Sequence, residues 1–152
     1  MKYREPSDIE IFTWDKGTVI RDYLLIAKQR LEDKSRDRIV AIGRATQTIC
    51  QEDTYVCNPF RNGIIDEWED SVQLIKYYVN KACKPKLFRK VKVAVCMLPG
   101  ATGIEKKAME EAMFLAGAKK VFLTELTREE FTRKEESKEY DLIISIGQNF
   151  RG

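Results

Sequence analysis

Apolar residues change their spacing from one segment of the chain to the next, and this change predicts alternating strands and helices. Residues 91–97 form a short apolar run rich in β-branched side chains, which indicates a buried strand. Thr102 and Glu105 then stand at capping-box spacing, and a helix is expected from there to Gly117. Its expected buried face consists of Ile104, Ala108, Met109, Ala112, Leu115 and Ala116. A strand at 120–124 completes a strand–helix–strand unit, which predicts a parallel pair with a right-handed crossover.

The rest of the pattern predicts further strands and a second long helix. The expected elements are strands at 9–14, 18–27 and 39–42, a short helix at 44–50, an amphipathic helix at 67–82 and a strand at 141–147. The long helix should bury Trp68, Val72, Ile75 and Val79. The charged stretch 127–140 contains a second capping box, Thr127 with Glu130.

Length and composition are those of one globular domain. The 152 residues are 43% hydrophobic and 34% charged, and no apolar run is long enough to span a bilayer. The first residues lack the apolar core of a signal peptide, so we expect a cytoplasmic protein. The net charge of +3 is spread over interleaved charges of both signs, which favours a solvated surface over a nucleic-acid interface.

Few residues offer catalytic or metal chemistry. The chain has no histidine, which excludes Ser-His-Asp and Cys-His catalysis, and its four cysteines form no C-x-x-C pair, so we expect no metal. The turn at 99–105 leads into a helix N-terminus, where backbone N–H groups can bind an anion. Gly100, Thr102 and Gly103 are therefore candidate anion-binding residues, and the alternative is a plain capped turn.

Five segments together resemble the MreB family of bacterial actins. The turn Gly100–Glu105 is similar to the family's "Gly-Ile-Thr-x-x-Glu", and Ala116–Leu123 to its "Ala-Gly-Ala-x-x-Val-(Phe/Tyr)-Leu". Upstream, the similar segments are Asn58–Asp66, Leu74–Lys81 and Ile39–Ala45. The resemblance covers about residues 9–125 and implies an α/β fold, the ribonuclease-H-like first domain of actins. We expect one domain over 1–152, with a central mixed sheet, flanking helices and a small lobe at about 21–60.

The same resemblance implies that the ATPase machinery is lost. The family's first phosphate loop follows its opening strand, and nothing similar precedes the strand at 9–14, which aligns with the family's second strand. Its water-positioning glutamate falls on Leu126, which cannot accept a hydrogen bond. Its second phosphate loop has a remnant at 144–150, with Ser145 at the aspartate position and Gly147 as the retained glycine. The family's second domain and adenine pocket are not expected here, and neither is a cofactor.

The sequence leaves three functional hypotheses open. The first is a non-catalytic MreB-like protein of the cell-shape cytoskeleton that binds an intact MreB, a cytoskeletal membrane partner or itself. The second is a nucleotide- or phosphate-binding protein with a rebuilt site at the 99–105 turn. The third is a decayed actin paralogue without a selected role.

The missing opening strand predicts a place for the tail. Without that strand, the sheet would have an open slot between the strands at 9–14 and 91–97, exposing unpaired backbone groups. The tail strand at 141–147 is apolar nearly throughout, as expected for a strand buried on both faces. We therefore predict that it folds back into this slot, with 127–140 as the connection. The alternative is insertion into a second copy, which would give a swapped homodimer.

Overall fold

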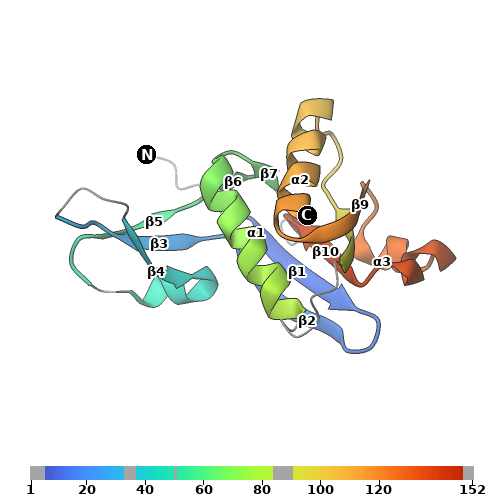
Figure 1. The fold of residues 1–152 in the computed structure, drawn as a ribbon, viewed down its shortest axis with the longest axis horizontal. Helices are drawn as coiled ribbons and strands as arrows, with labels where there is room; N and C mark the ends of the chain where they lie inside the picture. The colour runs from blue at the N-terminus through green and yellow to red at the C-terminus, as the bar shows by residue number, and fades with distance from the viewer. Residues whose placement is uncertain (1–5, 33–36, 50, 84–90, 149–152) are drawn as a thin grey trace.

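A five-stranded mixed sheet forms the centre of the molecule in the computed structural model, which describes residues 6–32, 37–49, 51–83 and 91–148. Its strand order is β2-β1-β10-β8-β9 (Figure 1). The strands are β1 (Asp8–Thr13), β2 (Gly17–Tyr23), β8 (Val91–Cys96), β9 (Ala118–Thr124) and β10 (Leu142–Ile146). β8 runs parallel to both β9 and β10, and β1 runs antiparallel to both β2 and β10. This architecture confirms the expected α/β fold.

The tail strand lies where the sequence predicts it. β10 pairs with β1 on one side, with Ile11 opposite Ile144, and with β8 on the other, with Val95 opposite Ile144. Every residue of β10 is buried. The slot is therefore filled by the chain's own strand, and the swapped arrangement is not needed to complete the sheet.

Hydrogen bonds fix both ends of β10 to its neighbours. At its start, the N–H of Asp141 donates to the carbonyl of Lys92 at 2.8 Å, and the N–H of Lys92 donates to the Asp141 carboxylate at 2.8 Å. Beyond its end, the N–H of Gly147 donates to the carbonyl of Asp8 at 2.9 Å. These contacts set the register of the strand as well as its position.

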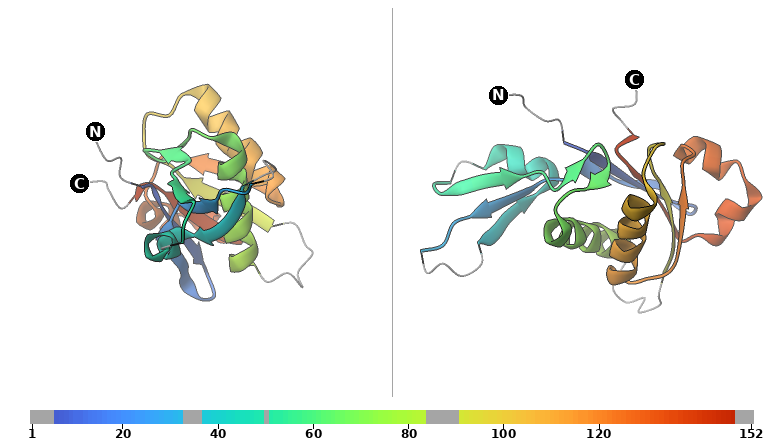
Figure 2. Two further views of the ribbon diagram at one scale, coloured as in Figure 1. Left: turned by 90° about the vertical axis from the view of Figure 1, so that its left-hand side faces the viewer. Right: turned by 90° about the horizontal axis from the view of Figure 1, so that it is seen from above.

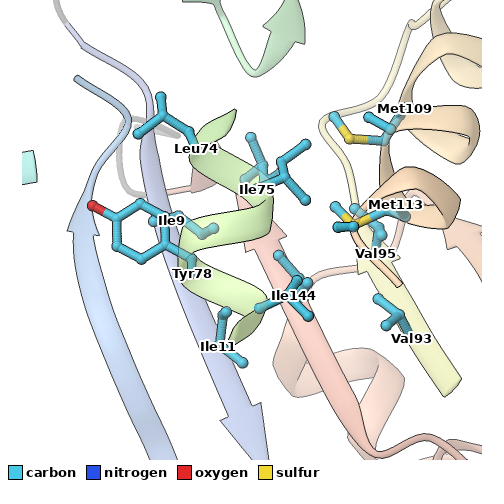
Figure 3. Packing of buried hydrophobic residues seen from close by; sticks show 14 of the residues in the cluster. Ile9, Ile11, Leu74, Ile75, Tyr78, Val93, Val95, Met109, Met113 and Ile144 are labelled. Carbon is cyan, nitrogen blue, oxygen red and sulfur yellow. The ribbon is translucent and has the colours of Figure 1, made fainter. Parts of the chain in front are cut away.

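Two helices cover one face of the sheet, which we call the front face. They are α1 (Trp68–Ala82) and α2 (Gly103–Leu115), and they pack side by side (Figure 2). Figure 3 shows side chains from both helices meeting those of β1, β8 and β10. The buried residues labelled there are Ile9, Ile11, Leu74, Ile75, Tyr78, Val93, Val95, Met109, Met113 and Ile144.

The opposite face, the back face, is covered by the segment that leads into β10. This segment contains the five-residue α3 (Arg128–Thr132) and the 3₁₀ helix η2 (Glu135–Glu139). Phe131 and Tyr140 from the segment pack on Ala94, Cys96 and Ile143 of the sheet. The predicted capping box of Thr127 and Glu130 is present at the start of α3.

A second, three-stranded sheet forms a small lobe beside the central sheet. It has the order β4-β3-β5, from β3 (Ile26–Gln29), β4 (Arg38–Ile42) and β5 (Thr54–Cys57), and it projects to the left in Figure 1. The 3₁₀ helix η1 (Gly43–Thr48) follows β4. A short hairpin of β6 (Phe60–Arg61) and β7 (Ile64–Ile65) returns the chain to α1. The three strands and η1 fall within the range 21–60 expected for the lobe.

Several local predictions are corrected. The strand expected at 18–27 is two strands in different sheets, because the chain leaves the central sheet at Leu24 and Leu25, which are both buried in the passage. The helix expected at 44–50 is the shorter 3₁₀ helix η1, and Cys50 lies outside the described residues.

The buried faces of both long helices are also corrected. Ile104 is 85% exposed and Leu115 is 57% exposed, since α2 turns Met109, Ala112 and Met113 toward the sheet instead. On α1, the buried residues are Ser71, Leu74, Ile75, Tyr78 and Val79. Trp68, expected in the core, is 39% exposed.

Candidate functional site

The carboxyl ends of the parallel strands β8, β9 and β10 meet at one edge of the central sheet. In open α/β sheets this edge is where ligands usually bind. The loop after β8 carries the candidate turn at 99–105, the loop after β9 carries Glu125 and Leu126, and Gly147 and Gln148 come directly after β10. The fold therefore brings all the candidate residues from the sequence to one edge.

The candidate anion turn is held by carboxylates. The hydroxyl of Thr102 accepts the N–H of Glu105 at 3.1 Å, and the Glu105 carboxylate accepts the N–H of Thr102 at 2.9 Å. The N–H of Gly100 donates to Glu125 at 3.3 Å. The capping box is confirmed, and two of the N–H groups that an anion would need already donate to carboxylates.

The charges around this turn do not favour an anion. The Glu125 carboxylate also pairs with Lys106 at 3.4 Å. A small cavity of about 230 Å³ lies beside the start of α2, between Glu105 and the β6–β7 hairpin. Its guanidinium, from Arg61, already pairs with Asp66 at 3.0 Å. A phosphate in this cavity would face carboxylates at short range. Among the described residues, the one cation that lines the cavity, Arg61, is already paired with Asp66.

The side chain of Leu126 packs against the back face of the sheet instead of facing the edge. Its side chain is half-buried and packs against the back-face cluster of Phe131, Tyr140 and Ile143. Its backbone N–H donates to the Thr124 hydroxyl at 3.1 Å. The resemblance puts the family's water-positioning glutamate here, and the chain uses the position for apolar packing.

The end of β10 is packed closely against the β6–β7 hairpin. Gly147 has φ +76°, and a Cβ there would lie 3.1 Å from the Cα of Gly63. A Cβ on Gly63, which has φ +79°, would lie 3.2 Å from the carbonyl oxygen of Ile146. Both glycines are therefore required by a close approach of two backbones. Gly147, which the resemblance aligns with a glycine of the family's second phosphate loop, has a packing role here that the sequence did not indicate.

Two further hydrogen bonds near this edge support the fold. The side-chain amide of Gln148 donates to the carbonyl of Cys96 at 3.3 Å, and the N–H of Gly63 donates to the Ser7 hydroxyl at 2.9 Å. Burial raises the pKa of the Cys96 thiol to about 12, even though the Ser145 hydroxyl and the charge of Arg128 lower it, so this thiol stays protonated. Among the described residues, no three His, Cys, Asp or Glu side chains lie close enough together to hold a metal ion.

A family model and individual relatives both relate this chain to the MreB and Mbl proteins. Residues 7–129 match the family model described as "MreB/Mbl protein". The chain is 25% identical over 122 residues to the cell shape-determining protein Mbl of Bacillus cereus, covering 78% of this chain and 35% of the relative. It is 24% identical over 119 residues to the cell shape-determining protein MreB of Pasteurella multocida, covering 76% of this chain and 34% of the relative.

Solved structures show the same fold. The crystal structure of MreB5 of Spiroplasma citri bound to ADP superposes with a TM-score of 0.64 at 19% identity, covering 79% of this chain and 35% of that one. The structure of the same protein bound to AMPPNP gives a TM-score of 0.66 at 18% identity, covering 82% and 39%. The chain thus spans about a third of the length of the relatives that it matches. Within the described residues, no helix is both long and apolar enough to cross a membrane.

Proposed function

This chain belongs to the MreB/Mbl protein family, and from that premise we propose that it acts in the cell-shape cytoskeleton without hydrolysing ATP, by binding another protein. The partner is an intact MreB, a cytoskeletal membrane partner or a second copy of this chain. The proposed place of action is the cytoplasm.

The position of β10 is the observation that carries the proposal. The family's opening strand and the phosphate loop after it belong between the strands that match β1 and β8. In this chain β1 and β8, the two strands that border this position, are both already hydrogen-bonded to β10. After β10 come Gly147, packed on the backbone of Gly63, and Gln148, whose amide donates to Cys96. This arrangement supports a scaffold in which the phosphate-binding loop has been replaced by a structural strand.

The loop after β9 gives independent support. Leu126 stands at the glutamate position and packs into the back-face core, so it cannot orient a water molecule. The neighbouring Glu125 accepts the N–H of Gly100 and pairs with Lys106, so its carboxylate helps to fix the start of α2. Neither side chain is placed to assist attack on a phosphoryl group.

The catalytic half of the proposal is tested by calorimetry and a phosphate-release assay. We expect no ATP binding in the micromolar range, with or without Mg²⁺, and no hydrolysis. The variant Leu126→Glu should stay inactive, because one carboxylate does not restore the cradle for the phosphates. Micromolar ATP binding or Mg²⁺-dependent hydrolysis by the wild-type chain would overturn this half.

The binding half is tested by immobilising the chain and measuring its association with purified MreB, purified Mbl and itself. The control is Ile144→Asp, which puts a charge into the middle of the sheet and should abolish any association that needs the fold. Saturable binding to at least one of these proteins, lost in the control, is expected. If none of them binds, and a cytoskeletal membrane protein does not bind either, the decayed-paralogue hypothesis is favoured instead.

A further inference from the structure

A groove separates the small lobe from the start of α1 and has no part in the site at the sheet edge. It encloses about 590 Å³, which is enough for a few side chains of a ligand. One wall is the face of the small sheet that carries Lys28 and Ile39, together with Asp37 just before β4. The other wall is the first turn of α1 and the residue before it, with Glu67, Trp68 and Glu69. We call it the acidic groove.

The acidic groove has the opposite charge to the chain as a whole. Its walls carry four carboxylates and one ammonium, whereas the chain has a net charge of +3. The ammonium of Lys28 lies 2.9 Å from Asp70, so these two charges compensate each other. Burial lowers the pKa of Lys28, but the hydrogen bond and charge of Asp70 outweigh this and raise it overall, which keeps the Lys28 ammonium charged. The carboxylates of Asp37, Glu67 and Glu69 remain as the excess charge.

Helix stability accounts for only part of this arrangement. Acidic residues in the first turn of a helix interact favourably with its dipole, which explains Glu69 and Asp70. It does not explain Asp37, which lies on the facing wall and accepts a hydrogen bond from the Tyr55 hydroxyl. Nor does it explain two large apolar side chains left in water beside the carboxylates: Trp68 is 39% exposed and Ile39 is 41% exposed.

The chemistry of the two walls defines the ligand. A guanidinium or ammonium group gains from carboxylates and from the face of an indole ring, and an apolar side chain gains from Ile39 and the rest of the indole. A bare metal ion does not fit, since no three of the described carboxylates lie close enough to share one. A nucleic acid does not fit either, because its phosphates would face like charges. We infer that the acidic groove binds a basic peptide segment of a partner protein, in which arginine or lysine alternates with apolar side chains.

This inference gives the proposed protein-binding role a surface and a partner chemistry, and it rests on that role for its biological sense. The two can fail separately. Association with MreB or Mbl can persist when the groove is altered, which would place the interface elsewhere. Binding of a basic peptide is measured without any cytoskeletal protein.

The test is the fluorescence anisotropy of a labelled synthetic peptide, Arg-Leu-Arg-Leu-Arg, with Glu-Leu-Glu-Leu-Glu as the reversed-charge probe. The double variant Glu67→Gln/Glu69→Gln should weaken binding of the basic peptide about tenfold. The matched control is Glu110→Gln/Glu111→Gln on α2, which removes the same charge away from the groove and should change binding by less than about twofold. The acidic peptide should not bind any of these proteins.

Two further variants keep the test decisive if the first pair disturbs α1. Asp37→Asn alters the facing wall, where the Tyr55 hydroxyl can still donate to the amide oxygen, and it should also weaken binding. Trp68→Leu keeps an apolar side chain but removes the indole face, and it should weaken binding with little change in thermal stability. Equal losses in the groove and control variants, or no binding to the wild type, would overturn the inference.

Discussion

The two faces of the central sheet are covered by different kinds of structure. The front face is packed under two helices of 15 and 13 residues, and its cluster is mostly aliphatic and methionine side chains. The back face is packed under a five-residue helix and a 3₁₀ helix. Its cluster has fewer residues and includes the aromatic rings of Phe131 and Tyr140. There, Phe131 and Tyr140 stack with Phe122, with ring centroids 5.8 and 5.9 Å from it. The two helices that cover the front face lie within the family match, whereas much of the back-face cover lies beyond residue 129.

β10 is the element that joins the two faces. Its side chains alternate, so that Leu142, Ile144 and Ile146 enter the front cluster and Ile143 enters the back cluster. The indole N–H of Trp14 donates to the carbonyl of Ser137 at 3.2 Å and ties the back cover to the end of β1. A strand outside the matched region therefore completes a core that the matched region cannot close alone.

Removing β10 should therefore have the largest effect of any change considered. Deletion of residues 141–152 would expose the facing edges of β1 and β8 and open both clusters to water. We expect aggregation, or loss of the cooperative unfolding transition in circular dichroism. A truncated chain that stays soluble and equally stable would show that β10 does not hold the sheet together.

A matched pair of substitutions compares the two faces directly. Ile143 and Ile144 are neighbours on β10, have the same side chain and are both buried, but they point to opposite faces. Ile144→Ala should cost about 3–5 kcal/mol, because the two long helices cannot move into the cavity that this truncation leaves on the front face. Ile143→Ala should cost about 2–3 kcal/mol, because the short helices on the back face can relax into the cavity left there. Urea unfolding measures both values. An equal or larger cost at Ile143 would contradict the view that the back cover is the more adaptable one.

A buried thiol on the back face, Cys96, should make the stability of the protein fall at alkaline pH. Burial raises the pKa of Cys96 from 9.0 to about 12, so above pH 9 the unfolded chain loses a proton that the folded chain keeps. The contribution of this thiol to stability is complete below pH 9 and is lost as the pH rises toward 12. Between about pH 8 and about pH 10 the wild type should lose about 1 kcal/mol more stability than Cys96→Ala. The buried Tyr78, whose pKa is also raised, is common to both proteins and cancels. Identical pH profiles would contradict the assignment.

Local periodicity predicted most of the strands, whereas the slot was predicted from the resemblance to the MreB family, whose opening strand has no counterpart before β1. The run at 91–97, the capping boxes at Thr102 and Thr127 and the two-sided burial of β10 all result from short-range rules. Helix faces were predicted less well, since the side of α2 that meets the sheet depends on where α1 already lies. The close approach of Gly63 and Gly147 and the acidic groove join distant segments, and no local pattern indicates such contacts.

The smallest change in stability is expected for Leu115→Ala, on the outer side of α2. Helical spacing places Leu115 with the core residues of α2, but its side chain is 57% exposed, because Ala112, Met113 and Ala116 occupy the inward side of that turn. Leu115→Ala should thus change the free energy of unfolding by less than about 0.5 kcal/mol. Val93→Ala, in the middle of β8 and fully buried, should cost about 2 kcal/mol and serves as the comparison in the same urea titrations. A cost at Leu115 that approaches the cost at Val93 would mean that a second layer covers the outer side of α2 in solution, and the front face would then extend beyond the two helices.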